Sequence, residues 1–162
     1  MARPRADASR VALFKHADPH SGTVNWTGEE ASDLLQWLTE LRDCPPITHP
    51  MVLQCERHAD DPQFCGYVQA DPREGVARRR CVACAQVTDL VDSGERWTFP
   101  ETHECPSCCQ SLVELAVGVS ADDEGHAHWL ALASRCVGCG RITGLTDAVL
   151  DGRPVDEVLA GV

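Results

Sequence analysis

The sequence has no long apolar run, and this argues against a membrane-spanning helix. A bilayer span needs about 18 or more consecutive apolar residues, and the 162-residue chain contains no such stretch. Its first ten residues carry positive charge, but no apolar stretch of signal-peptide length follows them. We therefore expect a protein of the reducing cytoplasm, where cysteines persist as thiols or as metal thiolates.

Large aromatic side chains are scarce as well. They make up 5% of the residues, although 43% of the chain is hydrophobic. A core built mainly from Leu, Val and Ala needs additional stabilisation in so small a protein. The ten cysteines can supply it, and in a reducing compartment we expect them to bind metal rather than to form disulfides.

Basic residues are outnumbered. The chain has 14 Lys and Arg against 25 Asp and Glu, which gives a net charge of −11. Binding to a phosphate backbone depends mainly on cationic side chains, so this balance disfavours a general nucleic-acid binder. It still allows a small basic patch, and the acidic surface suits a basic protein partner or simple solubility.

Familiar catalytic motifs are missing from the sequence. It contains no nucleophile elbow, P-loop, dinucleotide-binding fingerprint or His-Glu-x-x-His motif. We therefore expect that the protein is not an enzyme.

Most of the cysteines occur in closely spaced pairs. Three are Cys-x-x-Cys and one is Cys-x-x-His: Cys81/Cys84, Cys105/Cys108, Cys136/Cys139 and Cys55/His58. Each such turn brings two ligand atoms to one point, and four pairs are what two tetrahedral sites require. Intervals of 22 and 27 residues separate the two pairs of each set. An interval of that length can form a hairpin that closes two turns on one ion.

These pairs lie in an internal repeat. Residues 81–90 align without gaps on residues 136–145, with five of ten positions identical. Residues 70–75 and 121–125 also match and share a Glu-Gly turn. We therefore expect each copy to run as metal-binding turn, strand, Glu-Gly turn, strand, metal-binding turn, strand. Ala85 and Gly140 follow the second cysteine of their pairs, where a tightly curled chain favours small residues.

This pattern resembles the zinc-ribbon family over roughly 55–92 and 105–147. The resemblance implies a small zinc-stabilised α+β fold, with two tandem ribbon-like β-hairpin modules preceded by one amphipathic helix. It also implies two structural zinc ions. The implied ligands are Cys55, His58, Cys81 and Cys84 at site 1, and Cys105, Cys108, Cys136 and Cys139 at site 2. Four protein ligands leave no open coordination position, so neither site is expected to be catalytic.

Site 1 departs from the usual four-cysteine ribbon because it uses a histidine. Cys65 is an alternative ligand, but His58 is favoured because it falls in register with Cys108 in the repeat. The cysteines without a pair, Cys44, Cys65 and Cys109, are interpreted as ordinary buried thiols. His126 and His128 are interpreted as part of a solvated hairpin.

The N-terminal region contains the clearest helical pattern. Thr27 to Glu30 resemble a capping box, and apolar residues then recur at helical spacing, which predicts an amphipathic helix over 28–43 that ends before Pro45. Its apolar face is expected to pack on the ribbons of the same chain. A short strand is predicted at 11–14. The predicted organisation is an N-terminal strand and helix region (1–50), ribbon 1 (51–95), ribbon 2 (96–150) and a tail with a short helix (151–162).

The leading functional hypothesis is a non-catalytic zinc-binding adaptor that docks a protein partner. The alternative is a factor of the transcription or nucleic-acid machinery, since many zinc ribbons belong to it. Its candidate contact residues are Arg78, Arg79 and Arg80, or the acidic tip Asp122, Asp123 and Glu124, which is similar to the tip of transcript-cleavage elongation factors. A minor alternative is a rubredoxin-like iron electron carrier. The composition suggests a bacterial source, and the sequence leaves the partner, the pathway and the oligomeric state open.

Overall fold

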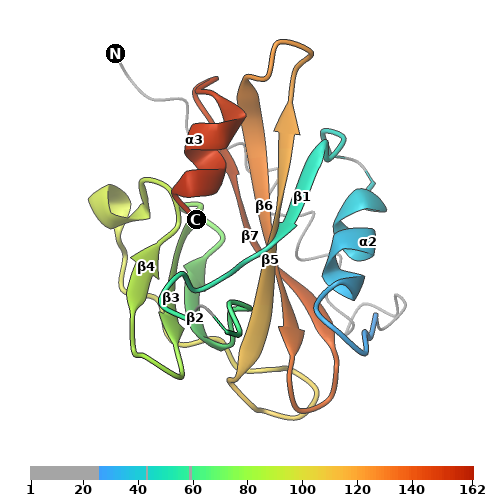
Figure 1. Cartoon of the computed structure of the whole chain (residues 1–162), viewed down its shortest axis with the longest axis vertical. Coiled ribbons are helices and arrows are strands. Elements are labelled where there is room, and N and C mark those ends of the chain that lie inside the picture. Colours follow the sequence, from blue (N-terminus) through green and yellow to red (C-terminus); the bar gives the residue numbers. More distant parts are fainter. Residues whose placement is uncertain (1–25, 43, 59) are drawn as a thin grey trace.

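The computed structural model describes residues 26–42, 44–58 and 60–162. The strand predicted at 11–14 lies outside these residues. Within them the chain forms seven strands, two α-helices and one 3₁₀ helix (Figure 1). The strands are β1 (His49–Val52), β2 (Gly66–Asp71), β3 (Val76–Cys81), β4 (Val87–Asp89), β5 (Val113–Ala121), β6 (Ala127–Cys136) and β7 (Ile142–Val149). The helices are α2 (Asp33–Thr39), α3 (Val155–Ala160) and the 3₁₀ helix η2 (Ser93–Arg96).

All strand pairs are antiparallel, in the order β4-β3-β2-β5-β6-β7, and β1 also pairs with β5. β2 meets β5 only at the pair Gly66–Val113, so β2, β3 and β4 diverge from β5 there. β2 and β3 also contact β7, which is not their neighbour in the sheet. The β2–β4 part therefore folds over one face of the β5–β7 part.

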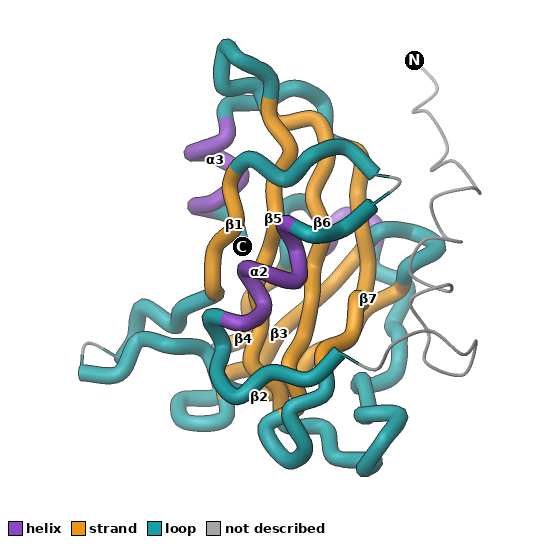
Figure 2. The backbone as a smooth tube through the Cα atoms, turned by 90° about the vertical axis from the view of Figure 1, so that its right-hand side faces the viewer, coloured by secondary structure: helices purple, strands orange, loops and turns teal. Residues whose placement is uncertain are grey.

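Two hydrophobic clusters fill the faces of β5–β7. Alternate residues of β5 and β6 point to opposite faces, as expected of strands. Leu115 and Leu132 belong to the cluster under β2–β4 and α3. Ala116 and Ala133 belong to the cluster between the sheet and α2 (the α2 cluster). Figure 2 shows α2 lying across the strands on its side of the sheet. The result is a small α+β fold, as the sequence predicts, and its elements are arranged in three layers.

The N-terminal helix is shorter than predicted, and its predicted cap is wrong. It runs over Asp33–Thr39 instead of 28–43. Thr27 does not cap it, because Thr27 forms a β-bridge with Arg141. The turn before the helix is instead held by Asp33, whose carboxylate accepts hydrogen bonds from the N–H groups of Glu29 and Glu30 at 2.7 and 3.1 Å. The apolar face still packs on the chain's own sheet, and this prediction is confirmed.

Strands from both predicted ribbons belong to one sheet, and residues of both contribute to the same core cluster. The proposed domain boundaries stay a prediction. The short C-terminal helix is present as α3, and β1 crosses the boundary between regions 1–50 and 51–95, where the sequence predicts no strand. Of the helices in the described ranges, none is both long enough and apolar enough to cross a membrane.

Candidate metal centres

Three of the four metal-binding turns share one backbone geometry. In each, the first cysteine (Cys81, Cys105 or Cys136) donates its N–H to the carbonyl five residues later, at 2.8–2.9 Å. The residue after the pair donates its N–H back to the first cysteine, also at 2.8–2.9 Å. That residue has a positive φ in every case: 60° at Ala85, 61° at Cys109 and 76° at Gly140. This left-handed backbone is the reason for small residues there, and Cys109 is the exception.

Gly140 is required for a second reason. A Cβ at this position would lie 2.5 Å from the carbonyl oxygen of Gly28. The two glycines are in fact joined, since the N–H of Gly28 donates to the carbonyl of Gly140 at 2.8 Å. The N–H of Ile142 donates to Trp26 at 2.8 Å in the same way. The segment leading into α2 is therefore bound directly to a metal-binding turn of site 2.

The sheet register sets the turns side by side. Gly66 pairs with Cys81 at the end of β3, and Val113 pairs with Cys136 at the end of β6. In each half of the chain, the hairpin therefore brings the second Cys-containing turn back beside the first. The Cys55–His58 turn differs from the other three, because the N–H of Cys55 donates to Pro62 at 2.6 Å.

Site 2 brings together the four cysteines expected there: Cys105, Cys108, Cys136 and Cys139. Their sulfur atoms all lie within 4.8 Å of one another. Cys105 and Cys139 are 3.6 Å apart, and Cys108 and Cys136 are 3.5 Å apart. A tetrahedral zinc with bonds of about 2.3 Å places its sulfurs about 3.8 Å from each other, so the group fits this ion. All ten cysteines lie in the described residues, and none of them forms a disulfide.

Site 1 brings together Cys55, His58, Cys81 and Cys84 within the same 4.8 Å limit. The sulfurs of Cys55 and Cys84 are 3.6 Å apart, and Nε2 of His58 lies 3.4 Å from the sulfur of Cys81. These distances again suit a tetrahedral ion with one nitrogen ligand, for which N···S is about 3.6 Å. Cys65 does not belong to this group.

Each cluster contains one thiol that ionises readily. Burial raises the pKa of Cys81, but N–H groups of Cys84 and Ala83 outweigh it and, with His58, lower the pKa to about 6. Cys105 follows the same pattern, with a pKa of about 7. Burial and the neighbouring thiols raise the pKa of Cys139 to about 12. One thiol at each site would therefore lose its proton readily to form a first metal bond, and metal binding would release the remaining protons.

A polar contact outside the ligands joins the two turns of site 2. Arg141, which is buried, donates to the hydroxyl of Ser107 at 2.5 Å. Contacts of this kind hold ligand turns in place. No motif in the sequence indicates this pair. The only signal was the position of Arg141 two residues after a ligand.

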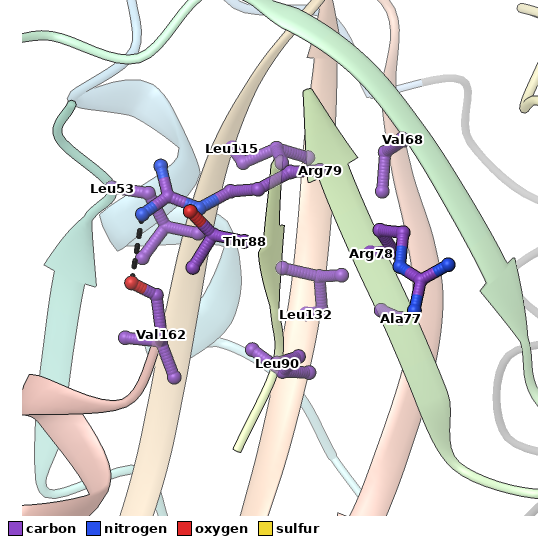
Figure 3. Close-up of a pocket in the computed structure, with 10 residues that line it drawn as sticks. All are labelled: Leu53, Val68, Ala77, Arg78, Arg79, Thr88, Leu90, Leu115, Leu132 and Val162. Atoms are coloured by element: carbon purple, nitrogen blue, oxygen red, sulfur yellow. Dashed lines mark hydrogen bonds between the residues drawn. The ribbon is translucent and has the colours of Figure 1, made fainter. Parts of the chain in front are cut away.

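Of the three candidate arginines, two are engaged within the fold. Arg78 forms an ion pair with Asp89 at 2.5 Å and lies 4.0 Å over the ring of Trp97. Arg79 points to the opposite side of β3 and donates to Val162 at 2.7 Å (Figure 3). Arg80 is exposed and lies 5.3 Å from the ring of Tyr67.

Arg79 also balances charge at site 1. It is partly buried, donates to the carbonyl of Gln54 at 2.9 Å and lies 4.8 Å over the ring of Phe64. Burial lowers its pKa, while the neighbouring thiols of Cys55 and Cys81 oppose the shift. With a divalent ion bound, three thiolates and one neutral histidine would leave one negative charge at site 1, which this guanidinium would offset.

The acidic tip of the β5–β6 hairpin is an ordered turn. Oδ1 of Asp122 accepts hydrogen bonds from the N–H groups of Glu124 and His126 at 3.0 and 2.9 Å. The bond from the His126 backbone, followed by that from the His128 ring, holds the pKa of Asp122 well below its usual range. Asp123 and Glu124 are exposed.

The three cysteines outside the closely spaced pairs differ from one another. Cys44 and Cys65 are partly buried, and Cys44 packs against the α2 cluster. Cys109 is exposed, so its interpretation as a buried thiol is wrong. It occupies the positive-φ position after Cys108.

Comparison with known protein families, with curated proteins and with solved structures finds no match to this chain. The interpretation of the sites rests on their own geometry.

Proposed function

We propose that this chain is a non-catalytic zinc-binding adaptor of the cytoplasm, in which two structural zinc ions hold tandem ribbon-like modules. The ligands would be the four side chains of site 1 and the four of site 2. Two observations support this: the ligand atoms of each site lie within 4.8 Å of one another, and their separations suit a tetrahedral ion. Such an ion cross-links the chain and leaves no position for a substrate.

The tandem arrangement is supported by the order of the elements. A metal-binding turn, β2, β3, a second turn and β4 are followed by a turn, β5, β6, a turn and β7. Gly75 and Gly125 both have a positive φ, 65° and 83°, at the ends of the two hairpin turns. The two halves thus use the same local devices in the same order.

The observation that carries the docking role is the exposure of Phe99. Its side chain is 83% exposed, and its φ is 55°. A positive φ at a residue other than glycine costs about 1–3 kcal/mol. The ring meets Trp97 edge-on, with 6.4 Å between centroids, and Trp97 in turn is covered by Arg78. Phe99 is thus an exposed aromatic side chain in contact with a second aromatic ring, and aromatic residues of this kind dominate many protein interfaces.

A photocrosslinking amino acid at position 99 tests this role in the native cell. We expect one discrete crosslinked protein from position 99 and none from position 149. Val149 is the control because it is 51% exposed and lies on β7. The adaptor proposal fails if both positions give the same diffuse products.

The transcription-associated alternative ranks lower. Arg78 and Arg79 are held by contacts within the fold, which leaves Arg80 as the exposed member of that cluster. In the acidic tip, Asp122 is fixed by the hydrogen bonds of its own turn. The arginine contacts do not favour binding to nucleic acid, and Oδ1 of Asp122 is already engaged within its own turn.

A further inference from the structure

Two histidines stand together at the tip of the β5–β6 hairpin. β5 ends at Ala121 and β6 begins at Ala127. His126 and His128 flank Ala127, so their side chains share one face of the strand. Asp122, at the end of the opposite strand, donates its N–H to the carbonyl of His126 at 3.0 Å.

Asp122 presents one carboxylate oxygen to both imidazoles. Its Oδ1 is fixed by the two N–H groups of the turn. Its Oδ2 therefore points outward and lies 3.0 Å from Nε2 of His128 and 3.4 Å from Nδ1 of His126. Glu124 adds a second carboxylate, with Oε2 3.6 Å from Nδ1 of His126.

The backbone under these side chains is held from both sides. On the side away from β5, the N–H of Ala127 donates to Arg153 at 2.9 Å, and the N–H of Leu150 donates to His128 at 2.9 Å. The side chains themselves are open to solvent, since those of His126 and His128 are 44% and 56% exposed. A metal ion could therefore bind these exposed side chains without any rearrangement of the core.

The donor set is one that metal ions of intermediate hardness prefer. Imidazole nitrogen and carboxylate oxygen bind zinc, nickel and cobalt, at bonds of about 2.0–2.2 Å. Ligand atoms around such an ion lie about 3.0–3.4 Å from one another, which the two contacts of Asp122 Oδ2 match.

We propose that the hairpin tip is a third metal site, at which His126, His128 and Asp122 bind a divalent transition-metal ion. In the two cysteine clusters all ligand atoms lie within 4.8 Å of one another, whereas those of the tip do not. One exposed imidazole must rotate to complete it, so binding is weaker and exchangeable. Three ligands leave coordination positions for water or for a donor atom of another molecule.

Titration of the zinc-loaded full chain with Co²⁺, followed by calorimetry and absorption, tests the site. We expect one further equivalent of Co²⁺ with weak visible bands and no intense near-ultraviolet thiolate bands, because no cysteine takes part. H128A and H126A should each weaken binding more than tenfold, because loss of a direct ligand costs at least as much as loss of an outer-shell partner, for which the cost is about 10–100-fold. H49A is the matched control, since His49 is exposed and lies on β1.

Three outcomes would overturn the proposal. One is the absence of a further equivalent in the native chain. Another is its retention in the H126A/H128A double variant with an unchanged melting temperature. The third is the appearance of thiolate bands with release of zinc, which would assign the binding to the cysteine clusters. None of these outcomes depends on whether the protein is an adaptor.

Discussion

Trp129 donates its indole N–H to a carboxylate oxygen of Asp147 at 2.8 Å, across the β6–β7 pair. The two residues are only 1% and 7% exposed. Trp129 is therefore both a packing residue of the cluster under α2 and a hydrogen-bond donor to a buried acid.

Replacing Trp129 by Phe should therefore destabilise the fold by more than lost volume alone. A hydrogen bond contributes about 0.5–1.5 kcal/mol to stability, and more where the acceptor is charged. We expect urea unfolding of the zinc-loaded protein to show a loss of at least this size. Trp26→Phe is the control because Trp26 is 44% exposed. Equal unfolding midpoints for the two variants would contradict the assigned role.

The protein should contain two zinc ions per chain and be colourless. Elemental analysis after purification without added metal checks the number. A value near zero or one would refute the two-site proposal. Red, oxidised iron in site 2 would instead support the rubredoxin-like alternative.

Loss of a ligand should unfold the protein, because structural zinc binding contributes on the order of 10 kcal/mol per site in small peptides. Cys136→Ser should abolish cooperative melting or solubility. Cys109→Ser should leave both unchanged, since this thiol is exposed and outside the cluster. Thermal melting of both variants, followed by circular dichroism, checks this prediction. Equal melting temperatures for the two variants would refute the ligand assignment.

His58 and Cys65 make opposite predictions at site 1. His58→Ala should lose one equivalent of zinc, because Nε2 lies 3.4 Å from the sulfur of Cys81. Cys65→Ala should retain both. Zinc release measured with a chromogenic chelator distinguishes them. The reverse pattern would show that Cys65 is the ligand.

Random duplex DNA should not bind the protein at micromolar concentration and physiological salt. The net charge is −11, and Arg78 and Arg79 are engaged within the fold. A mobility-shift assay checks this. Tight, salt-sensitive binding that Arg78→Glu abolishes would favour the nucleic-acid alternative instead.

The clustering of the ligands was predictable because it depends on short spacings. A Cys-x-x-Cys turn is local, and the repeat identified which turns belong to the same half of the chain. The positive φ at Ala85 and Gly140 follows from the same local geometry.

What could not be predicted depends on contacts between distant residues. Thr27 has the sequence of a helix cap, but its backbone pairs with Arg141, so the helix begins later. β1 was missed because Pro50 disfavours a strand. It is accommodated because β1 pairs only with β5 among the described strands. The Asp122–His128 contact likewise requires the hairpin register, which no short motif shows.

The bond between Gly28 and Gly140 makes the helix and site 2 thermodynamically dependent. Arg135 strengthens the link, since its guanidinium donates to the carbonyls of Gly28 and Glu29. Any metal that orders the 136–140 turn must therefore favour docking of α2, and docking must raise the affinity for that metal by the same factor. Removal of the ion would weaken the packing of α2 on the sheet. The solvent exposure of Leu34 and Trp37 would then depend on whether site 2 holds its metal.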